Sequence, residues 1–115
     1  MKAYIKLGHK IEVYLPSQDK HGTILDDDRR NAMRDRAATT LSTLFGGCTG
    51  SNAVGYYKSE TLGTVQTENI LVLFSFAERL DAWYVEQLDR LAHDIKSELA
   101  QESVMVTIDG TAIFM

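Results

Sequence analysis

The sequence has 115 residues, of which 44% are hydrophobic and 24% are charged, and this size and composition indicate one ordered, soluble domain. Its net charge of -4 argues against a nucleic acid or an anionic membrane as partner, because both attract basic surfaces. The only cysteine is Cys48, and residues 1–10 lack the apolar segment of a signal peptide, so we expect a cytoplasmic protein.

The chain begins with a predicted strand. Ile11, Val13 and Leu15 alternate with Lys10, Glu12 and Tyr14, which is the period of a strand with one buried face. Proline has no backbone N–H to donate to a sheet, so we expect residue 16 to end the strand. A similar alternation over residues 4–7 predicts an extension of this strand toward the N-terminus.

A helix is predicted next. Residues 26–28 are three aspartates, whose carboxylates can cap free backbone N–H groups at the positive end of a helix. The apolar residues that follow recur at helical spacing, namely Met33, Ala37, Leu41, Leu44 and Phe45. Gly46 and Gly47 then end the helix, because glycine accepts the left-handed conformation of a helix C-terminus.

The second half predicts a hairpin, a helix and a final hairpin. Strands at 53–59 and 65–76 are joined by a turn over residues 61–64 that contains Gly63. A helix over roughly residues 78–100 carries a regular apolar stripe. A strand at 104–108 then reaches Asp109-Gly110, a dipeptide typical of two-residue hairpin turns.

The order of these elements predicts the fold class. Strand, helix, strand, strand, helix, strand is the order of the ferredoxin-like α+β sandwich with an antiparallel sheet, here with a C-terminal hairpin extension. Right-handed crossovers place both helices on one face of the sheet. The other face is predicted to expose Leu71, Leu73 and either Tyr56 or Tyr57. An apolar patch of that size predicts a homodimer.

Several short motifs resemble the domain of unknown function 3574 family, which consists of small bacterial proteins without an assigned activity. The resemblance extends from Ile11 to Ile108. Its matching positions are Phe45, Gly47, Thr49, Gly55, Tyr57, Glu68 and the run Gln101-Glu102-Ser103-Val104. The resemblance implies the same fold and marks positions, but it implies no function.

Glu68 is the leading candidate for a functional residue. It precedes the apolar run at 70–74, which predicts a partly buried carboxylate, although a strand-end carboxylate in solvent is the simpler alternative. Gln101 follows the second helix, where it serves either as a ligand contact or as a cap for free carbonyl groups. The candidate binding residues are Thr49, Tyr56, Tyr57, Glu68 and Gln101, and the candidate interface residues are Leu71 and Leu73.

Other motifs do not predict a catalytic or metal site. Cys48 follows a helix C-terminus, where the helix dipole disfavours a thiolate. Histidines 9, 21 and 93 lack the spacing of metal ligands, and the glycine-rich run at 46–50 lacks the lysine of a phosphate-binding loop. We therefore expect no metal and no cofactor.

Three functions remain open from the sequence. The leading hypothesis is a self-associating binding module, without enzymatic activity, that holds a small ligand or a protein at the open sheet face or between subunits. The second is a small enzyme that gathers Glu68, Tyr57, Thr49 and Gln101 near one end of the sheet, with Glu68 as general base. The third is a phage or mobile-element inhibitor of a host defence system.

Overall fold

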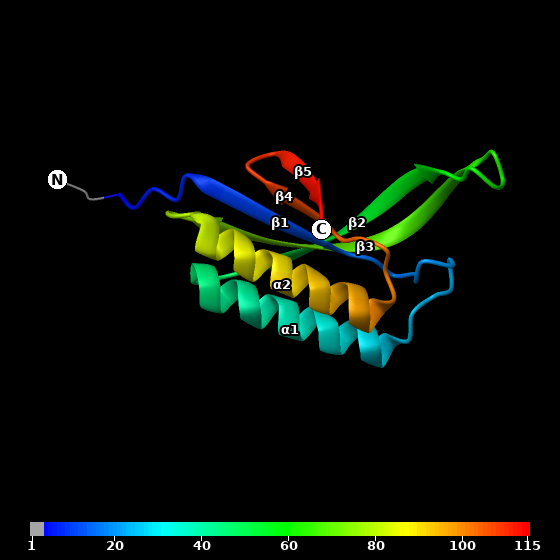
Figure 1. The fold of residues 1–115 in the computed structure, drawn as a ribbon, viewed down its shortest axis with the longest axis horizontal. Coiled ribbons are helices and arrows are strands. Elements are labelled where there is room, and N and C mark those ends of the chain that lie inside the picture. The colour runs from blue at the N-terminus through cyan, green and yellow to red at the C-terminus, as the bar shows by residue number, and fades with distance from the viewer. Residues whose placement is uncertain (1–3) are drawn as a thin grey trace.

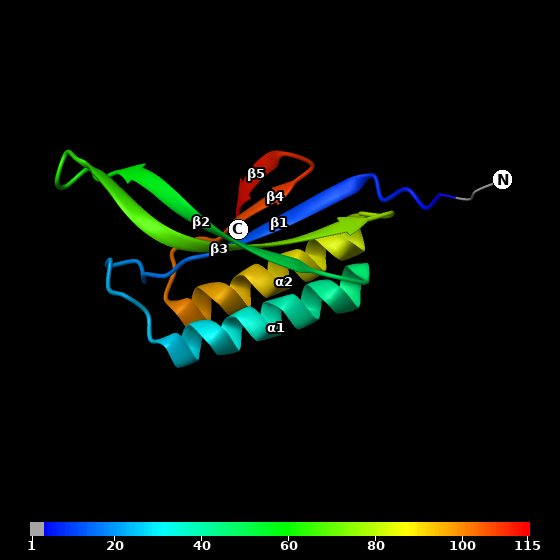
Figure 2. The same ribbon diagram turned by 180° about the vertical axis from the view of Figure 1, so that it is seen from behind.

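The computed structural model describes residues 4–115, which form two layers. Two helices lie side by side across one face of a five-stranded sheet (Figures 1 and 2). The elements in chain order are β1 (His9–Leu15), α1 (Asp27–Phe45), β2 (Thr49–Lys58), β3 (Val65–Ala77), α2 (Ala82–Leu99), β4 (Met105–Ile108) and β5 (Thr111–Phe114).

The sheet has the strand order β2-β3-β1-β4-β5, and all its pairs are antiparallel. The first four strands in this order form the ferredoxin-like arrangement, and β5 extends the sheet at the edge next to β4. The predicted ferredoxin-like fold with a C-terminal hairpin is therefore confirmed. No helix within residues 4–115 is long and apolar enough to cross a membrane.

Both helices begin at an aspartate cap. The Asp26 side chain accepts a hydrogen bond from the Asp28 backbone N–H, as predicted. The second helix begins at Ala82 rather than near residue 78, because the Asp81 side chain accepts from the N–H groups of Trp83 and Tyr84. Gly46 ends α1 with φ of 91°, in the left-handed conformation expected for that position.

The core lies between the helices and the sheet. Ile11, Val13 and Leu15 of β1 face it, as predicted, together with the apolar stripes of the two helices. The prediction for Leu71 and Leu73 is wrong, because Leu73 is buried in this core and Leu71 packs against it. In the antiparallel register, Leu71 and Leu73 pair with Leu15 and Val13, so they lie on the face that the helices cover.

The opposite sheet face carries residues 70, 72, 74 and 76 of β3. Lys10 reduces its exposed apolar area, because the Nζ atom lies 5.0 Å from the Phe74 ring centroid and 5.8 Å from that of Phe76. Val72 is 8% exposed. This face is therefore partly covered by its own side chains.

Two strand boundaries differ from the prediction by several residues. The second strand begins at Thr49 instead of residue 53, because residues 49–52 pair with Leu71 to Phe74 of β3. These residues are small and polar because β2 is an edge strand whose side chains are mostly exposed. Residues 4–8 form no strand, so the predicted extension of β1 is wrong.

The β2–β3 hairpin projects from the body of the protein as an arm (Figures 1 and 2). It projects because β3 pairs with β1 only from Leu71 to Ala77, whereas it pairs with β2 along its length from Val65 to Phe74. The arm contributes to a molecule that measures 59 Å in its longest dimension and 24 Å in its shortest.

Asp109 connects the final hairpin to the first strand. Its Oδ2 lies 2.7 Å from Nδ1 of His9, and its Oδ1 accepts a hydrogen bond from the Lys10 backbone N–H. These two hydrogen bonds, from His9 first and then from Lys10, hold the pKa of Asp109 below its ordinary value of 3.8.

We predict that Asp109→Asn lowers the free energy of unfolding at neutral pH but not in acid. A carboxyl group whose pKa is lower in the folded than in the unfolded protein adds stability above the unfolded value of 3.8. This contribution is lost as the pH falls through the lower, folded pKa. Urea denaturation between pH 7 and pH 2 should show the two proteins converging in acid. Asp89→Asn, at an exposed position of α2, is the control. A stability difference of Asp109→Asn that does not change with pH would contradict the prediction.

Candidate functional site

Glu68 lies where β1 ends and β3 continues. Pro16 cannot donate to the sheet, and the chain then turns away, which leaves the backbone N–H groups of Ser17 and Gln18 without a partner strand. Oε1 of Glu68 accepts a hydrogen bond from each of these groups, at 3.1 Å in both cases. The carboxylate is half-buried, as predicted, and is fixed by backbone donors.

Tyr57 lies on the same sheet face as Glu68. In the β2–β3 register, Gly55 pairs with Glu68 and Tyr57 pairs with Gln66, so Tyr57 is the diagonal neighbour of Glu68. A β-carbon at Gly55 would lie 2.5 Å from Cδ1 of Ile70, and its absence leaves room for that side chain. Tyr57 is 46% exposed, so its side chain is accessible to a ligand.

Gln101 reaches the same loop from the other layer. Its Nε2 donates to the carbonyl oxygen of Gln18 at 2.6 Å and to that of Leu99 at 2.8 Å. The backbone N–H of Lys20 donates to the carbonyl of Ala100 at 2.9 Å. Glu68 and Gln101 thus hold the loop at residues 17–20 from two sides, and Gln101 also caps the end of α2.

The other predicted site residues lie elsewhere. Thr49 pairs with Phe74, six positions from Glu68 along β3, which is roughly 20 Å at about 3.3 Å per residue. Tyr56 is 71% exposed and projects from the opposite face of the arm to Tyr57. Of the predicted cluster, Glu68 and Gln101 contact the same loop and Tyr57 is a diagonal neighbour of Glu68, whereas Thr49 lies apart.

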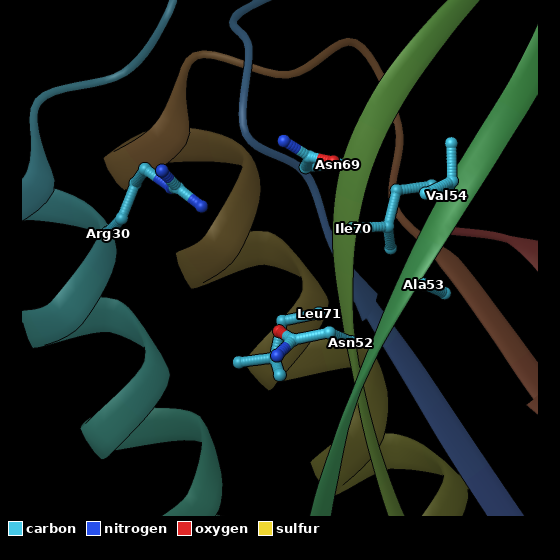
Figure 3. A pocket seen from close by; sticks show the side chains of 7 residues that line it. All are labelled: Arg30, Asn52, Ala53, Val54, Asn69, Ile70 and Leu71. Atoms are coloured by element: carbon cyan, nitrogen blue, oxygen red, sulfur yellow. The ribbon is translucent and has the colours of Figure 1, made fainter.

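A groove lies between α1 and the helix-facing side of the β2–β3 hairpin. It consists of two hollows of about 460 Å³ and about 300 Å³, which share Arg30, Asn52 and Leu71. Figure 3 shows Arg30 extending from α1 toward Asn69 of β3, with Asn52 and Leu71 below them. The remaining lining residues are Leu15, Pro16, Asn31, Arg34, Ala53, Val54, Ile70 and Leu99.

The groove and the Glu68 side chain lie on opposite faces of the β2–β3 hairpin. Asn69 shares the helix-facing side with Leu71, whereas Glu68 shares the other face with Tyr57. Sequence analysis missed Arg30, Asn52 and Asn69 because they belong to three separate elements. The signal available in the sequence was Asn69 within the predicted strand at 65–76, where this residue is uncommon. Asn52 lay outside the predicted strand at 53–59.

Two other groups have no role at this site. Burial raises the pKa of the Cys48 thiol, which disfavours a nucleophilic thiolate. Burial and the nearby Glu12 carboxylate raise the pKa of Tyr14 on the sheet face away from the helices. Within the described part of the chain, no three histidine, cysteine, aspartate or glutamate side chains cluster in a way that could hold a metal ion.

Comparison with solved structures identifies two similar folds. A phage SAM lyase in complex with S-methyl-5'-thioadenosine superposes with a TM-score of 0.67 at 14% sequence identity, over 100% of this chain and 94% of the lyase. A phage SAM lyase in the apo state superposes with a TM-score of 0.59 at 20% identity, over 97% of this chain and 91% of the lyase. These similarities support the fold.

No family model matches the chain, and no curated protein matches it. The resemblance to the domain of unknown function 3574 family therefore stays a prediction.

We predict that Glu68→Ala lowers the free energy of unfolding by about 1–3 kcal/mol, because it leaves two backbone N–H groups without an acceptor. Glu68→Gln should cost less, since its amide oxygen can accept the same hydrogen bonds. Urea denaturation measures both effects, and amide hydrogen exchange at Ser17 and Gln18 locates them. Glu60→Ala, in the exposed turn of the arm, is the control. Equal stability of the Glu68→Ala and Glu60→Ala proteins would contradict this role.

Proposed function

We propose that this protein binds an S-adenosyl nucleoside beside Glu68 and cleaves SAM, with S-methyl-5'-thioadenosine as a product. The observation that carries the proposal is a carboxylate fixed by two backbone N–H groups, with an exposed tyrosine beside it. The match of nearly the whole chain to a SAM lyase that holds S-methyl-5'-thioadenosine supports the choice of ligand.

The chemistry of SAM suits these two side chains. Its sulfur is a sulfonium cation, which a carboxylate attracts by charge and an aromatic ring attracts through its π face. Within residues 4–115, both hydrogen bonds to the Glu68 carboxylate go to Oε1, so Oε2 can face the ligand. When the carbon–sulfur bond breaks, its electron pair moves to sulfur and the thioether leaves without charge.

Glu68 has two distinct roles under this proposal. As an electrostatic partner, Oε2 binds the sulfonium and favours SAM over the neutral thioether product. As a general base, Oε2 removes a proton from the carbon next to the one bonded to sulfur. The electron pair of that C–H bond forms a carbon–carbon double bond in the amino-acid fragment as the carbon–sulfur bond breaks. This is the role predicted by the enzyme hypothesis. A binding module without catalysis, the leading hypothesis from the sequence, would use only the first role.

We predict that the protein converts SAM to S-methyl-5'-thioadenosine and that Glu68→Gln slows this reaction by at least 100-fold. The amide keeps the shape and the hydrogen bonds but neither the charge nor the basicity of the carboxylate. Chromatography of reaction mixtures measures the product, and Glu60→Gln is the matched control. Calorimetric titration with S-methyl-5'-thioadenosine tests binding separately. A protein that neither forms nor binds this thioether would overturn the proposal.

Both matched structures are phage proteins, which supports the third hypothesis, a phage or mobile-element function. Removal of SAM would deprive a host of a metabolite, and a cytoplasmic location would give access to it. The host system affected would then be one that consumes SAM.

We further propose that the protein self-associates through its arm. Val54, Tyr56 and Val65 lie on one face of the hairpin and are 54%, 71% and 65% exposed. These residues replace Leu71 and Leu73 as the candidate interface, because those two leucines belong to the core. A second copy would bury this apolar surface.

We predict that the mass of the protein in solution is at least twice the 12.9 kDa mass of the monomer. The double substitution Val54→Ser and Tyr56→Ser should reduce the mass to that of the monomer, because it removes apolar area from the arm. Size-exclusion chromatography with light scattering measures the mass at micromolar concentration. Ile24→Ser, which is as exposed but lies outside the arm, is the control. A monomeric wild-type protein would rule out this interface.

A further inference from the structure

The groove between α1 and the β2–β3 hairpin has a charge that is unusual for this chain. The protein has a net charge of -4, yet among residues 4–115 the only charged side chains that line the two hollows are Arg30 and Arg34. The aspartates at residues 26–28, which begin α1, do not line either hollow. The larger hollow has a volume of about 460 Å³, which is sufficient for a small organic molecule. The groove therefore offers an anion a concave, cationic surface on an acidic protein.

Arg30 is the arginine that is more available to a ligand. Its Nη1 atom lies 3.6 Å from Oδ1 of Asp27, which is longer than a hydrogen bond, and the Asp27 side chain is 87% exposed. An ion pair of this kind contributes little in water, so a ligand anion can replace it. Arg34, in contrast, donates hydrogen bonds to Asp35 at 3.0 Å and to Asn31 at 3.1 Å. We therefore expect Arg30 to be the main cationic contact.

Two asparagines line the groove opposite α1. Asn52 and Asn69 lie on the helix-facing side of adjacent strands as diagonal neighbours, a spacing of about 7–8 Å that one small group can bridge. In Figure 3, the Arg30 side chain extends from α1 toward Asn69, so the helix and the hairpin both contribute polar groups to this space. Asparagine is a poor strand former, so the sheet itself does not favour it at either position. Each amide can donate to an oxygen that a guanidinium leaves unpaired.

The lining indicates the chemical class of the ligand. A guanidinium group binds a carboxylate or a phosphate through two parallel hydrogen bonds, and side-chain amides can donate to the same oxygens. Leu71 and Val54 add apolar surface beside these polar groups. The lining thus fits a small organic molecule that combines one oxyanion group, a carboxylate or a phosphate, with a short apolar part.

We propose that this groove is a second binding site, in which Arg30, Asn52 and Asn69 hold the oxyanion group of such a molecule. The site is separate from Glu68, because the groove lies on the helix-facing side of the hairpin and the Glu68 side chain lies on the other face. The inference therefore goes beyond the proposed function and can be tested without SAM.

Three small probes test the site in nitrogen–proton correlation spectra of the full chain. Butyrate carries a carboxylate, ethyl phosphate carries a phosphate, and butyramide is the neutral counterpart of butyrate. Each anion replaces chloride at constant ionic strength, so that general screening does not change. At least one anion should shift the signals of Arg30 Nε–H and of the Asn52 and Asn69 side-chain amides in a saturable way. Its dissociation constant should be on the order of 1–10 mM, because the probes have few atoms.

Substitutions of Arg30 test its role directly. Arg30→Gln should weaken the binding of that anion about 10-fold or more, because it removes both the charge and the hydrogen-bonding fork. Arg30→Lys keeps the charge without the planar fork and should weaken binding by less. The matched control is Arg36→Gln in the same helix. Arg36 pairs with Asp94 and Glu98 outside the groove, so this variant should bind the anion as the wild-type protein does.

Three results would overturn the proposal. The first is that neither anion gives a saturable shift at these residues, even at about ten times the expected dissociation constant. The second is that butyramide binds as tightly as butyrate, because the charge would then have no role. The third is an equal loss of affinity in Arg30→Gln and Arg36→Gln, which would indicate a general attraction of anions to α1. None of these results bears on the proposed function, because no measurement involves Glu68 or SAM.

Discussion

The site depends on a difference in length between neighbouring strands. β3 has 13 residues and β1 has seven, so β3 continues past the point where its central neighbour stops. A strand edge without a partner exposes N–H and C=O groups that need acceptors and donors. At this point Glu68 supplies the acceptor for the departing chain, and the position of its carboxylate is therefore set by the backbone of residues 17 and 18.

The same difference in length creates the groove and the arm. Beyond Leu71, the face of the hairpin that turns toward the helices has no β1 beside it, and the space next to α1 stays partly open. Farther out, the hairpin leaves the helices altogether and exposes Val54 and Tyr56 on that face. The early end of β1 thus has three results, namely a fixed carboxylate, an amide-lined groove and an apolar arm. Pro16 is the residue that makes this end sharp, since it cannot donate to the sheet.

The element order and the caps could be predicted from local sequence. Alternation in β1, the aspartates before α1 and the Asp109-Gly110 turn are short-range signals, and the structure confirms them. Which side chains of β3 point toward the core could not be predicted, because the strand is apolar at both even and odd positions. Only its register with β1 decides that Leu71 and Leu73 face the core. The groove was also beyond local reasoning, because Arg30 and Asn69 come to line the same hollow only after both layers pack. Glu68 was identified by its unusual position, but its hydrogen bonds to the loop depend on tertiary structure.

Under the proposed function, the charge at Glu68 would favour the reactant over the product. Glu68 presents an anionic oxygen that two backbone N–H groups hold in place. SAM carries a sulfonium cation, whereas S-methyl-5'-thioadenosine is a neutral thioether. Cleavage would therefore remove this attraction in the same step that forms the product, and the loss of charge would favour product release.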